Sequence, residues 1–129
     1  MKEGMMGLRN LSSGSLQIDL DERADTISAC WRGKANARRP SALLAPLFED
    51  LVARASATKK NIDFRMAELE HVNSSTIVVI VQLIKRLEEA RIPIAIEYDA
   101  TTSWQRMIFS ALSYLSGPEK VLELRPRGA

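Results

Sequence analysis

Two adjacent serines, Ser74 and Ser75, carry the hydroxyl groups best placed for chemistry in this sequence. They lie in the stretch HVNSSTIVVIVQL, directly before an apolar run that begins at Ile77. If that run is a helix, its first turn exposes backbone N–H groups at the positive end of the helix dipole, where a negative charge is favoured. The two serines are therefore candidates for three roles: a helix cap, a catalytic nucleophile, or an acceptor for a phosphate group.

A hydrolytic role finds little support in the residues around the serines. The strained turn that exposes the nucleophile of α/β-hydrolases needs flanking glycines, and residues 73–76 contain none. His71 is the only histidine, and its expected place at a strand end gives no geometric reason for it to reach Ser74. Cys30 is expected on an alternating strand as a small core residue. An enzyme that uses Ser74 or Cys30 is kept only as an alternative.

Metal and nucleotide sites are not predicted. Neither the dinucleotide-binding pattern nor the P-loop pattern occurs in the chain. The single cysteine excludes an intramolecular disulfide and any multi-cysteine metal site, and no second histidine or cysteine stands at ligand spacing from His71. We therefore expect no catalytic residues, no metal and no cofactor.

A basic cluster follows the second predicted strand. It consists of Arg32, Lys34, Arg38 and Arg39, in a chain whose net charge is only +2. Such a cluster can bind nucleic acid or an acidic partner, but it is more often a solvated loop. Only Trp31 could stack on a base nearby, so we expect no nucleic-acid binding at physiological salt.

Length and composition indicate one globular domain. The chain has 129 residues, of which 46% are hydrophobic and 26% are charged, values close to the globular average. The opening MKEGMMGLRNLSSGS lacks the apolar core of a secretory signal, and no run reaches transmembrane length. The expectation is a cytoplasmic protein in a reducing compartment, without membrane insertion.

Hydrophobic spacing predicts alternating strands and helices. Apolar residues at every second position predict strands, the first two joined as a hairpin that ends at Gly33. Pro46 predicts that the first helix either begins near it or is kinked there. Thr102 and Gln105 form a predicted capping box for the last helix, whose shared apolar face would hold Trp104, Met107, Ile108, Ala111 and Leu112. The expected strands are 16–20, 26–31, 62–66, 94–98 and 121–124, and the expected helices are 41–57, 74–91 and one from 102 to the Gly117-Pro118 stop.

These elements predict an α/β fold. The strand-helix-strand unit around residues 62–98 favours parallel pairing, and the hairpin adds antiparallel pairing. The result would be a mixed sheet of about five strands with its helices packed mainly on one face. We expect a single domain at residues 16–125, a flexible N-terminal tail at 1–15 and a short C-terminal tail at 126–129.

The stretch IDFRMAELEHVNSSTIVVIVQLIKRLEEARIPIAIE resembles the STAS domain, which occurs in bacterial anti-sigma-factor antagonists and at the C-terminus of sulfate transporters. In the antagonists an Asp-Ser-Ser-Gly-Leu type motif opens the second helix. The corresponding residues here are Asn73, Ser74, Ser75, Thr76 and Ile77, so that asparagine replaces aspartate and threonine replaces glycine. The resemblance extends from about Leu16 to Leu124, with Gly33 at the family's glycine-containing strand end.

This resemblance implies a non-enzymatic partner-switching protein. The first serine of the family motif is phosphorylated by a partner kinase and freed by a phosphatase, a role that falls on Ser74, with Ser75 as second choice. The implied partners are an anti-sigma-like serine kinase and its matching phosphatase. The alternative is an accessory subunit of a membrane transport or signalling complex that binds without phosphorylation. The implied docking residues are Asn73, Ser74, Ser75, Thr76, Gly33 and Trp104.

Overall fold

A computed structural model describes residues 8–128 of the chain. Its strands and helices alternate along most of the sequence, as the hydrophobic spacing predicted. The strands are β2 (Leu11–Ser13), β3 (Leu16–Glu22), β4 (Thr26–Ala35), β5 (Asn61–Arg65), β6 (Leu69–Val72), β7 (Ile94–Asp99) and β8 (Leu122–Arg127). The α-helices are α1 (Pro40–Thr58), α2 (Ser74–Ala90) and α3 (Ser103–Ser110), and the 3-10 helix η1 (Ala111–Leu115) continues from α3.

The strands form one mixed sheet in the order β2-β3-β4-β5-β7-β8, with β6 paired to β4. The pairs β2/β3 and β3/β4 are antiparallel, whereas β4, β5, β6, β7 and β8 pair in parallel. The α/β class and the mixed sheet are confirmed, but the sheet has 7 strands rather than about five. The two additional strands, β2 and β6, have only 3 and 4 residues, too few for an alternating pattern to be recognised.

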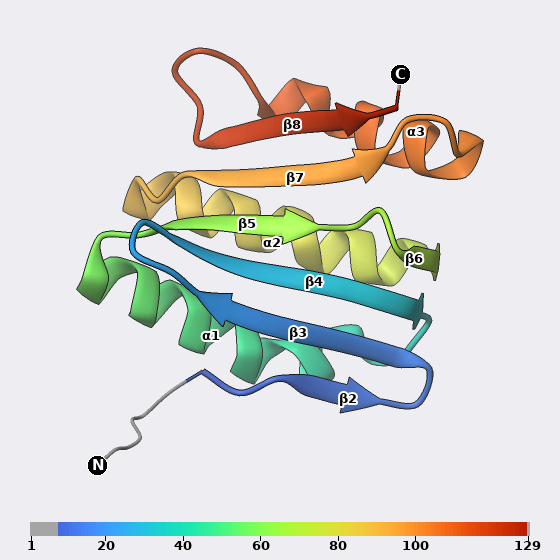
Figure 1. The fold of residues 1–129 in the computed structure, drawn as a ribbon, viewed down its shortest axis with the longest axis horizontal. Coiled ribbons are helices and arrows are strands. Elements are labelled where there is room, and N and C mark those ends of the chain that lie inside the picture. Colours follow the sequence, from blue (N-terminus) through green and yellow to red (C-terminus); the bar gives the residue numbers. More distant parts are fainter. Residues whose placement is uncertain (1–7, 129) are drawn as a thin grey trace.

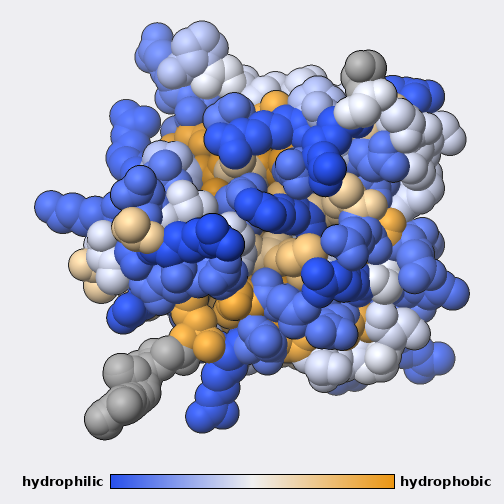
Figure 2. Space-filling view, viewed as in Figure 1, coloured by the Kyte–Doolittle hydropathy of each residue, from blue (hydrophilic) through white to orange (hydrophobic). Residues whose placement is uncertain are grey.

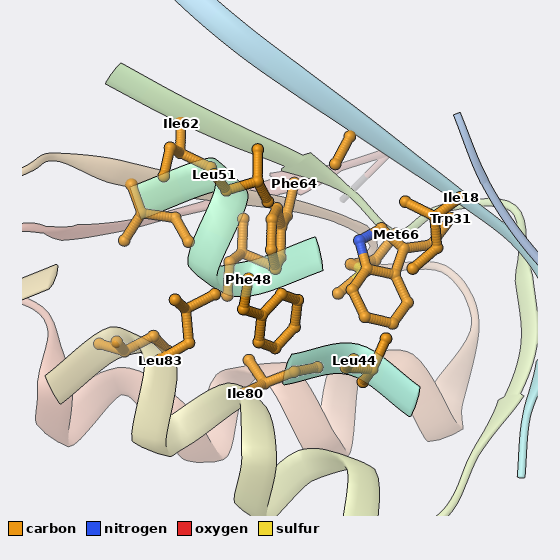
Figure 3. Close-up of a cluster of buried hydrophobic side chains, with 14 of the residues drawn as sticks. Ile18, Trp31, Leu44, Phe48, Leu51, Ile62, Phe64, Met66, Ile80 and Leu83 are labelled. Atoms are coloured by element: carbon orange, nitrogen blue, oxygen red, sulfur yellow. The ribbon is translucent and has the colours of Figure 1, made fainter. Parts of the chain in front are cut away.

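The helices α1 and α2 lie behind the sheet and cover one of its faces (Figure 1). Side chains on that face, including Trp31 and Phe64, are fully buried. Trp31, Phe48 of α1 and Phe64 pack as a cluster with ring centroids 5.4–6.2 Å apart, surrounded by aliphatic side chains (Figure 3). This core fixes both helices against the sheet, because strands with one apolar face must bury it.

The opposite face of the sheet remains open and polar. Hydrophilic residues cover most of it in Figure 2, which is viewed as in Figure 1. Ion pairs cross this face: Arg32 bridges Asp19 and Glu68, and Arg127 pairs with Glu97. The alternation of apolar and polar residues thus sorts the two faces of the sheet, as expected for strands with one solvated side.

Both predicted tails contribute strands. β2 falls inside the predicted tail 1–15, and β8 continues to Arg127, inside the predicted tail 126–129. These segments add backbone pairing at both edges of the sheet: Leu11 pairs with Ile18 of β3, and Arg127 pairs with Asp99 of β7. Residues 1–7 and 129 lie outside the described residues.

Helix α1 begins at Pro40 and contains Pro46 in its interior, so the prediction of a helix start near Pro46 is wrong. Pro40 stands in the first turn, where a missing N–H leaves no bond unmade. Pro46 is exposed, and so is Ala42, whose carbonyl loses its helical donor. Water can satisfy that carbonyl, which explains how the helix tolerates the proline.

The predicted capping box at the start of α3 is also wrong. Thr102 makes no side-chain cap, and its hydroxyl donates instead to Oδ2 of Asp99 at 2.7 Å. Gln105 is 99% buried, and it occupies the inner face of α3 with Phe109. Met107, predicted to be on the apolar inner face, is 71% exposed. The short helix therefore presents a face rotated from the one that apolar spacing suggested.

Gly33 does not end β4 but allows a close approach within it. The strand continues to Ala35, with a register irregularity between Gly33 and Lys34 where β6 pairs. Gly33 has φ +86°, and a Cβ there would lie 1.9 Å from the carbonyl oxygen of Ser15. That oxygen accepts a hydrogen bond from the Lys34 N–H at 3.1 Å. Only glycine fits both the backbone angle and this contact.

We expect Gly33→Ala to lower the free energy of unfolding by roughly 2–4 kcal/mol, because both the positive φ and the clash with backbone must be accommodated. Gly14→Ala is the matched control: Gly14 also has positive φ, but no atom lies within 4 Å of its added Cβ. Urea unfolding should show a smaller loss for Gly14→Ala, about 1 kcal/mol. Equal losses for the two variants would contradict the close-approach role of Gly33.

Glu22 connects the end of β3 to α1 and to the start of β5. Its carboxylate accepts hydrogen bonds from Arg54 Nε at 2.9–3.0 Å and from Lys60 Nζ at 2.7 Å. The hydrogen bond from Lys60, with Arg54 assisting and partial burial opposing, lowers the pKa of Glu22. The stabilisation is present above the pKa of an unfolded glutamate, about 4.3, and is lost as the pH falls through the lowered folded pKa.

Accordingly, we expect Glu22→Gln to lower the free energy of unfolding by about 1 kcal/mol at neutral pH. The difference from the natural chain should shrink below about pH 4, where the carboxylate of the natural chain becomes protonated. Urea titrations across this range measure it. Glu119→Gln, at an exposed position, is the control that should show no such pH-dependent difference.

Candidate functional site

The candidate site lies at the edge of the sheet where the parallel strands end. β4, β5, β6, β7 and β8 all end at this edge, and α1, α2 and α3 begin there (Figure 1, right). Ser74 is the first residue of α2, which extends over Ser74–Ala90 against the predicted 74–91. The sequence pattern thus placed the helix start correctly, although the apolar run after Ser75 is rich in residues that favour strands.

Asn73, and not either serine, caps α2. Its backbone is extended (φ −85°, ψ 164°), and its Oδ1 accepts a hydrogen bond from the Thr76 N–H at 2.9 Å. This is the usual N-cap geometry. Ser74 and Ser75 therefore occupy the first turn with exposed side chains, and neither hydroxyl is needed for the cap. Ser74 is therefore not the cap of α2, and a reactive role for its hydroxyl stays a prediction.

The amide group of Asn73 also explains why asparagine can stand where the family motif has aspartate. Its Nδ2 donates to the carbonyl of Ala37 at 3.0 Å, and its backbone N–H donates to the carbonyl of Ala35 at 2.9 Å. A carboxylate could make the cap but not the bond to Ala37, since it has no donor. Asn73 thus ties the loop after β4 to the start of α2.

Thr76 faces the interior rather than a partner. It is 99% buried, and its hydroxyl donates to Oδ1 of Asn73 at 2.5 Å, with the Ala35 carbonyl 3.5 Å away. Its side chain is therefore part of the support for the cap. The prediction that Thr76 contributes to a docking surface is corrected on this point, because a buried hydroxyl cannot contact a partner.

The other two predicted docking residues, Gly33 and Trp104, are engaged in contacts within the fold. Gly33 lies on the same edge but serves the close contact with Ser15. Trp104, in the first turns of α3, is half-buried and packs against the hydrophobic core. The predictions missed Val78, which is 54% exposed and lies four residues after Ser74 on the same face of α2. A helical projection could have indicated Val78, because it places this large apolar residue in line with Ser74 and away from the inner face of α2.

The residues considered for catalysis do not meet. His71 is exposed on β6 beside Lys34 of β4, and within the described residues it makes no hydrogen bond to Ser74 or Ser75. Cys30 lies on the open face of the sheet, where burial raises the pKa of its thiol, opposite to what an activated nucleophile needs. Among residues 8–128, no three metal-binding side chains gather at a possible ion site.

A hollow with a volume of about 310 Å³ lies on the open face of the sheet, away from the serines. Charged side chains of both signs line it, and its three arginines, Arg32, Arg65 and Arg127, already form ion pairs within the chain. Because its arginines are already paired, the described residues of this surface offer no free cation to an anionic ligand. The described part of the chain contains no helix with the length and apolar character needed to span a membrane.

The two hydrogen-bonding roles of Asn73 can be separated by mutation. Asn73→Asp keeps the cap but loses the donor to Ala37, whereas Asn73→Ala loses both. We expect a decrease in unfolding free energy of about 1–2 kcal/mol for Asn73→Ala and less for Asn73→Asp. Hydrogen exchange should show faster exchange at residues 36–39 in both variants. Unchanged exchange there would contradict the tie between the loop and α2.

Known structures match this arrangement. No protein-family model matches the chain, and no curated protein matches its sequence. A solved structure of the diguanylate cyclase SiaD in complex with its activator SiaC, from Pseudomonas aeruginosa, contains a chain that matches with a TM-score of 0.67 and 16% identity. The alignment covers 92% of this chain and 99% of that one, which is SiaC.

An anti-sigma factor antagonist from Mycobacterium paratuberculosis matches with a TM-score of 0.59 and 12% identity, over 92% of each chain. The chain has the STAS fold. In this fold the capped start of α2, the end of β4 and the start of α3 share one edge of the sheet. The fold expectation is therefore confirmed.

Proposed function

We propose that this STAS-fold chain is a non-enzymatic partner-switching protein of the cytoplasm, with Ser74 as its regulatory phosphorylation site. The observation that carries the proposal is that different residues supply the cap and the exposed hydroxyl at the start of α2. Asn73 supplies the cap, so the Ser74 hydroxyl is left exposed with no structural task. An exposed hydroxyl in a first helical turn is accessible to a kinase active site, and Ser75 is the second choice.

A phosphate fits this position electrostatically. It adds about −1.5 to −2 charge. The N–H groups of the first turn of α2 have no acceptors within the helix and favour a negative charge. Thr76 and Asn73, which hold the turn, make their hydrogen bonds inside the protein. The modification would therefore change the surface while leaving the core intact.

The docking surface proposed here consists of Asn73, Ser74, Ser75 and Val78. Ser74 and Val78 project from one face of α2, so a partner that packs on Val78 meets the Ser74 side chain directly. An unmodified serine allows that contact, whereas a phosphate introduces bulk and charge that must be desolvated. The proposed partners are an anti-sigma-like serine kinase, which phosphorylates Ser74, and a phosphatase that reverses the modification.

Intact-mass and peptide mass spectrometry of the protein from its own cells, with its co-purifying proteins, tests the proposal. A phosphate on Ser74 and a kinase-like partner are the expected result. An unmodified Ser74 in a chain bound to a transport or signalling complex would replace the proposal with the phosphorylation-independent accessory subunit. SiaC is the activator of the enzyme SiaD in the solved complex. An enzyme is therefore a further class of partner to look for in the same sample.

A further inference from the structure

Three cations lie beside the proposed docking surface without carboxylate partners. Lys34, Arg38 and Arg39 are exposed, and no carboxylate within the described residues comes within 4 Å of their charged groups to form an ion pair. Arg32, the fourth member of the sequence cluster, differs because it pairs with Asp19 and Glu68. The four-residue cluster is therefore divided into one neutralised member and three whose charge is uncompensated. We call Lys34, Arg38 and Arg39 the basic loop.

The fold joins the basic loop to the start of α2. The Asn73 amide donates to the carbonyl of Ala37, the residue before Arg38. Lys34 and Ala37 also line, together with Thr76, a small cavity of about 130 Å³ at the same edge. The loop is thus held next to Ser74 by contacts between residues far apart in the sequence, and its charges belong to the same surface.

Local backbone dipoles add to this positive charge. α1 begins at Pro40, directly after Arg39, and α2 begins at Ser74, and neither helix has an acidic residue in its first turn. Acidic residues usually occupy such turns because they offset the positive end of the dipole. Two carboxylates lie at the same edge of the sheet. Glu70 is exposed on β6, which pairs with β4, and forms no ion pair with the basic loop; Asp99, at the end of β7, accepts from the hydroxyls of Thr101 and Thr102.

We propose that the partner surface that docks beside Ser74 is acidic, and that the basic loop recognises it. This inference rests on the proposed function and assigns the chemistry of its partner. Complementary charge accelerates association and selects the partner. It also fits the proposed switch, because a phosphate of about −1.5 to −2 offsets much of the +3 of the basic loop. A phosphorylated chain would then have a weaker attraction for an acidic surface.

A protein surface fits the basic loop better than nucleic acid does. Trp31, the aromatic residue nearest to the cluster in sequence, is fully buried in the core and cannot stack on a base. Three cations would neutralise about three phosphates, a small number for a nucleic-acid site. Val78, beside Ser74, supplies an exposed apolar contact of the kind that protein interfaces use.

A titration with defined peptides tests the inference. The probe is a short acetylated peptide of alternating Glu and Gly, and its control contains Gln in place of Glu. The ¹⁵N-labelled, unphosphorylated protein should show shifts at residues 34–39 and 73–78 with the acidic peptide only. Arg38→Gln/Arg39→Gln should weaken the affinity about tenfold. Lys85→Gln/Arg86→Gln, two exposed cations further along α2 near Glu88 and Glu89, should change it less than twofold.

Three outcomes would overturn the inference: shifts centred on the open face of the sheet, equal weakening by the two double variants, or tighter binding of a mixed-sequence DNA or RNA oligonucleotide at the basic loop. The proposed function fails separately. An unphosphorylated Ser74 in cells would remove the switch but leave the peptide result unchanged, since the titration uses unmodified protein.

Discussion

Ser74→Asp should weaken binding of the co-purified partner at least tenfold, and Ser74→Ala should bind as the natural chain does. The carboxylate places a negative charge where the partner meets the first turn of α2, next to the basic loop, and so imitates the proposed phosphate in part. Ser74→Ala should in addition carry no phosphate at this position. Affinity is measured by calorimetry with purified partner, and modification by peptide mass spectrometry.

The fold should tolerate both changes at Ser74. Asn73 retains the cap, and an acidic residue in the first turn stabilises a helix by about 0.3–1 kcal/mol. Ser103→Asp is the matched control, because Ser103 is likewise the exposed first residue of a helix, α3. It should leave binding unchanged. Intact binding by Ser74→Asp would contradict the switch and favour the accessory subunit.

Gln105→Leu should lower the free energy of unfolding by roughly 2–4 kcal/mol. The Gln105 carboxamide is buried and accepts from the Asp99 N–H at 2.8 Å. Its Nε2 lies 3.0 Å from the carbonyl oxygens of both Met66 and Leu69, to which it donates. Leucine would fill the space but remove the side-chain partner of the Asp99 N–H and of the Leu69 carbonyl, while the Met66 carbonyl would keep only the Leu69 N–H, at 2.9 Å. That penalty, not lost packing, sets the size of the effect.

Urea unfolding measures the loss, and Gln82→Leu on the exposed side of α2 is the control. It should change stability by no more than about 0.5 kcal/mol. If both variants lost the same stability, the network around Gln105 would have no special weight. Since Met66 and Leu69 frame the turn that leads through β6 to Asn73, Gln105→Leu should also accelerate hydrogen exchange at residues 69–73.

Local spacing was sufficient for most of the elements. The alternation of Ile27, Ala29 and Trp31 correctly predicted the buried side of β4, and all three are fully buried. The long helical period after Ser74 outweighed the β-branched run at its start, because a helix of 17 residues repeats its pattern several times. The STAS resemblance rested on this same stretch, and the solved structures confirm the fold that it implied.

The spacing of apolar residues could not predict the short elements or the roles of single polar residues. β2 and β6 are too brief to show a period, and the eight-residue α3 allowed a wrong choice of its buried face. Gln105 matched a capping box in sequence, yet its partners in the fold are Met66 and Leu69. A residue that is polar by type gives no local sign that it will be enclosed among backbone groups from another part of the chain.

The sequence by itself determined the α/β class, the start of α2 and the presence of two hydroxyl side chains in its first turn, because these depend on periodicity and capping preferences within a few residues. Only the tertiary structure decided which residue caps α2, which face of α3 is buried, and that the basic loop lies beside Ser74. The contacts responsible join Asn73 to Ala37 and Gln105 to Leu69, each across 36 positions. Such pairs form only when the strands align at one edge of the sheet, so hydrogen-bond geometry settles what local patterns leave open.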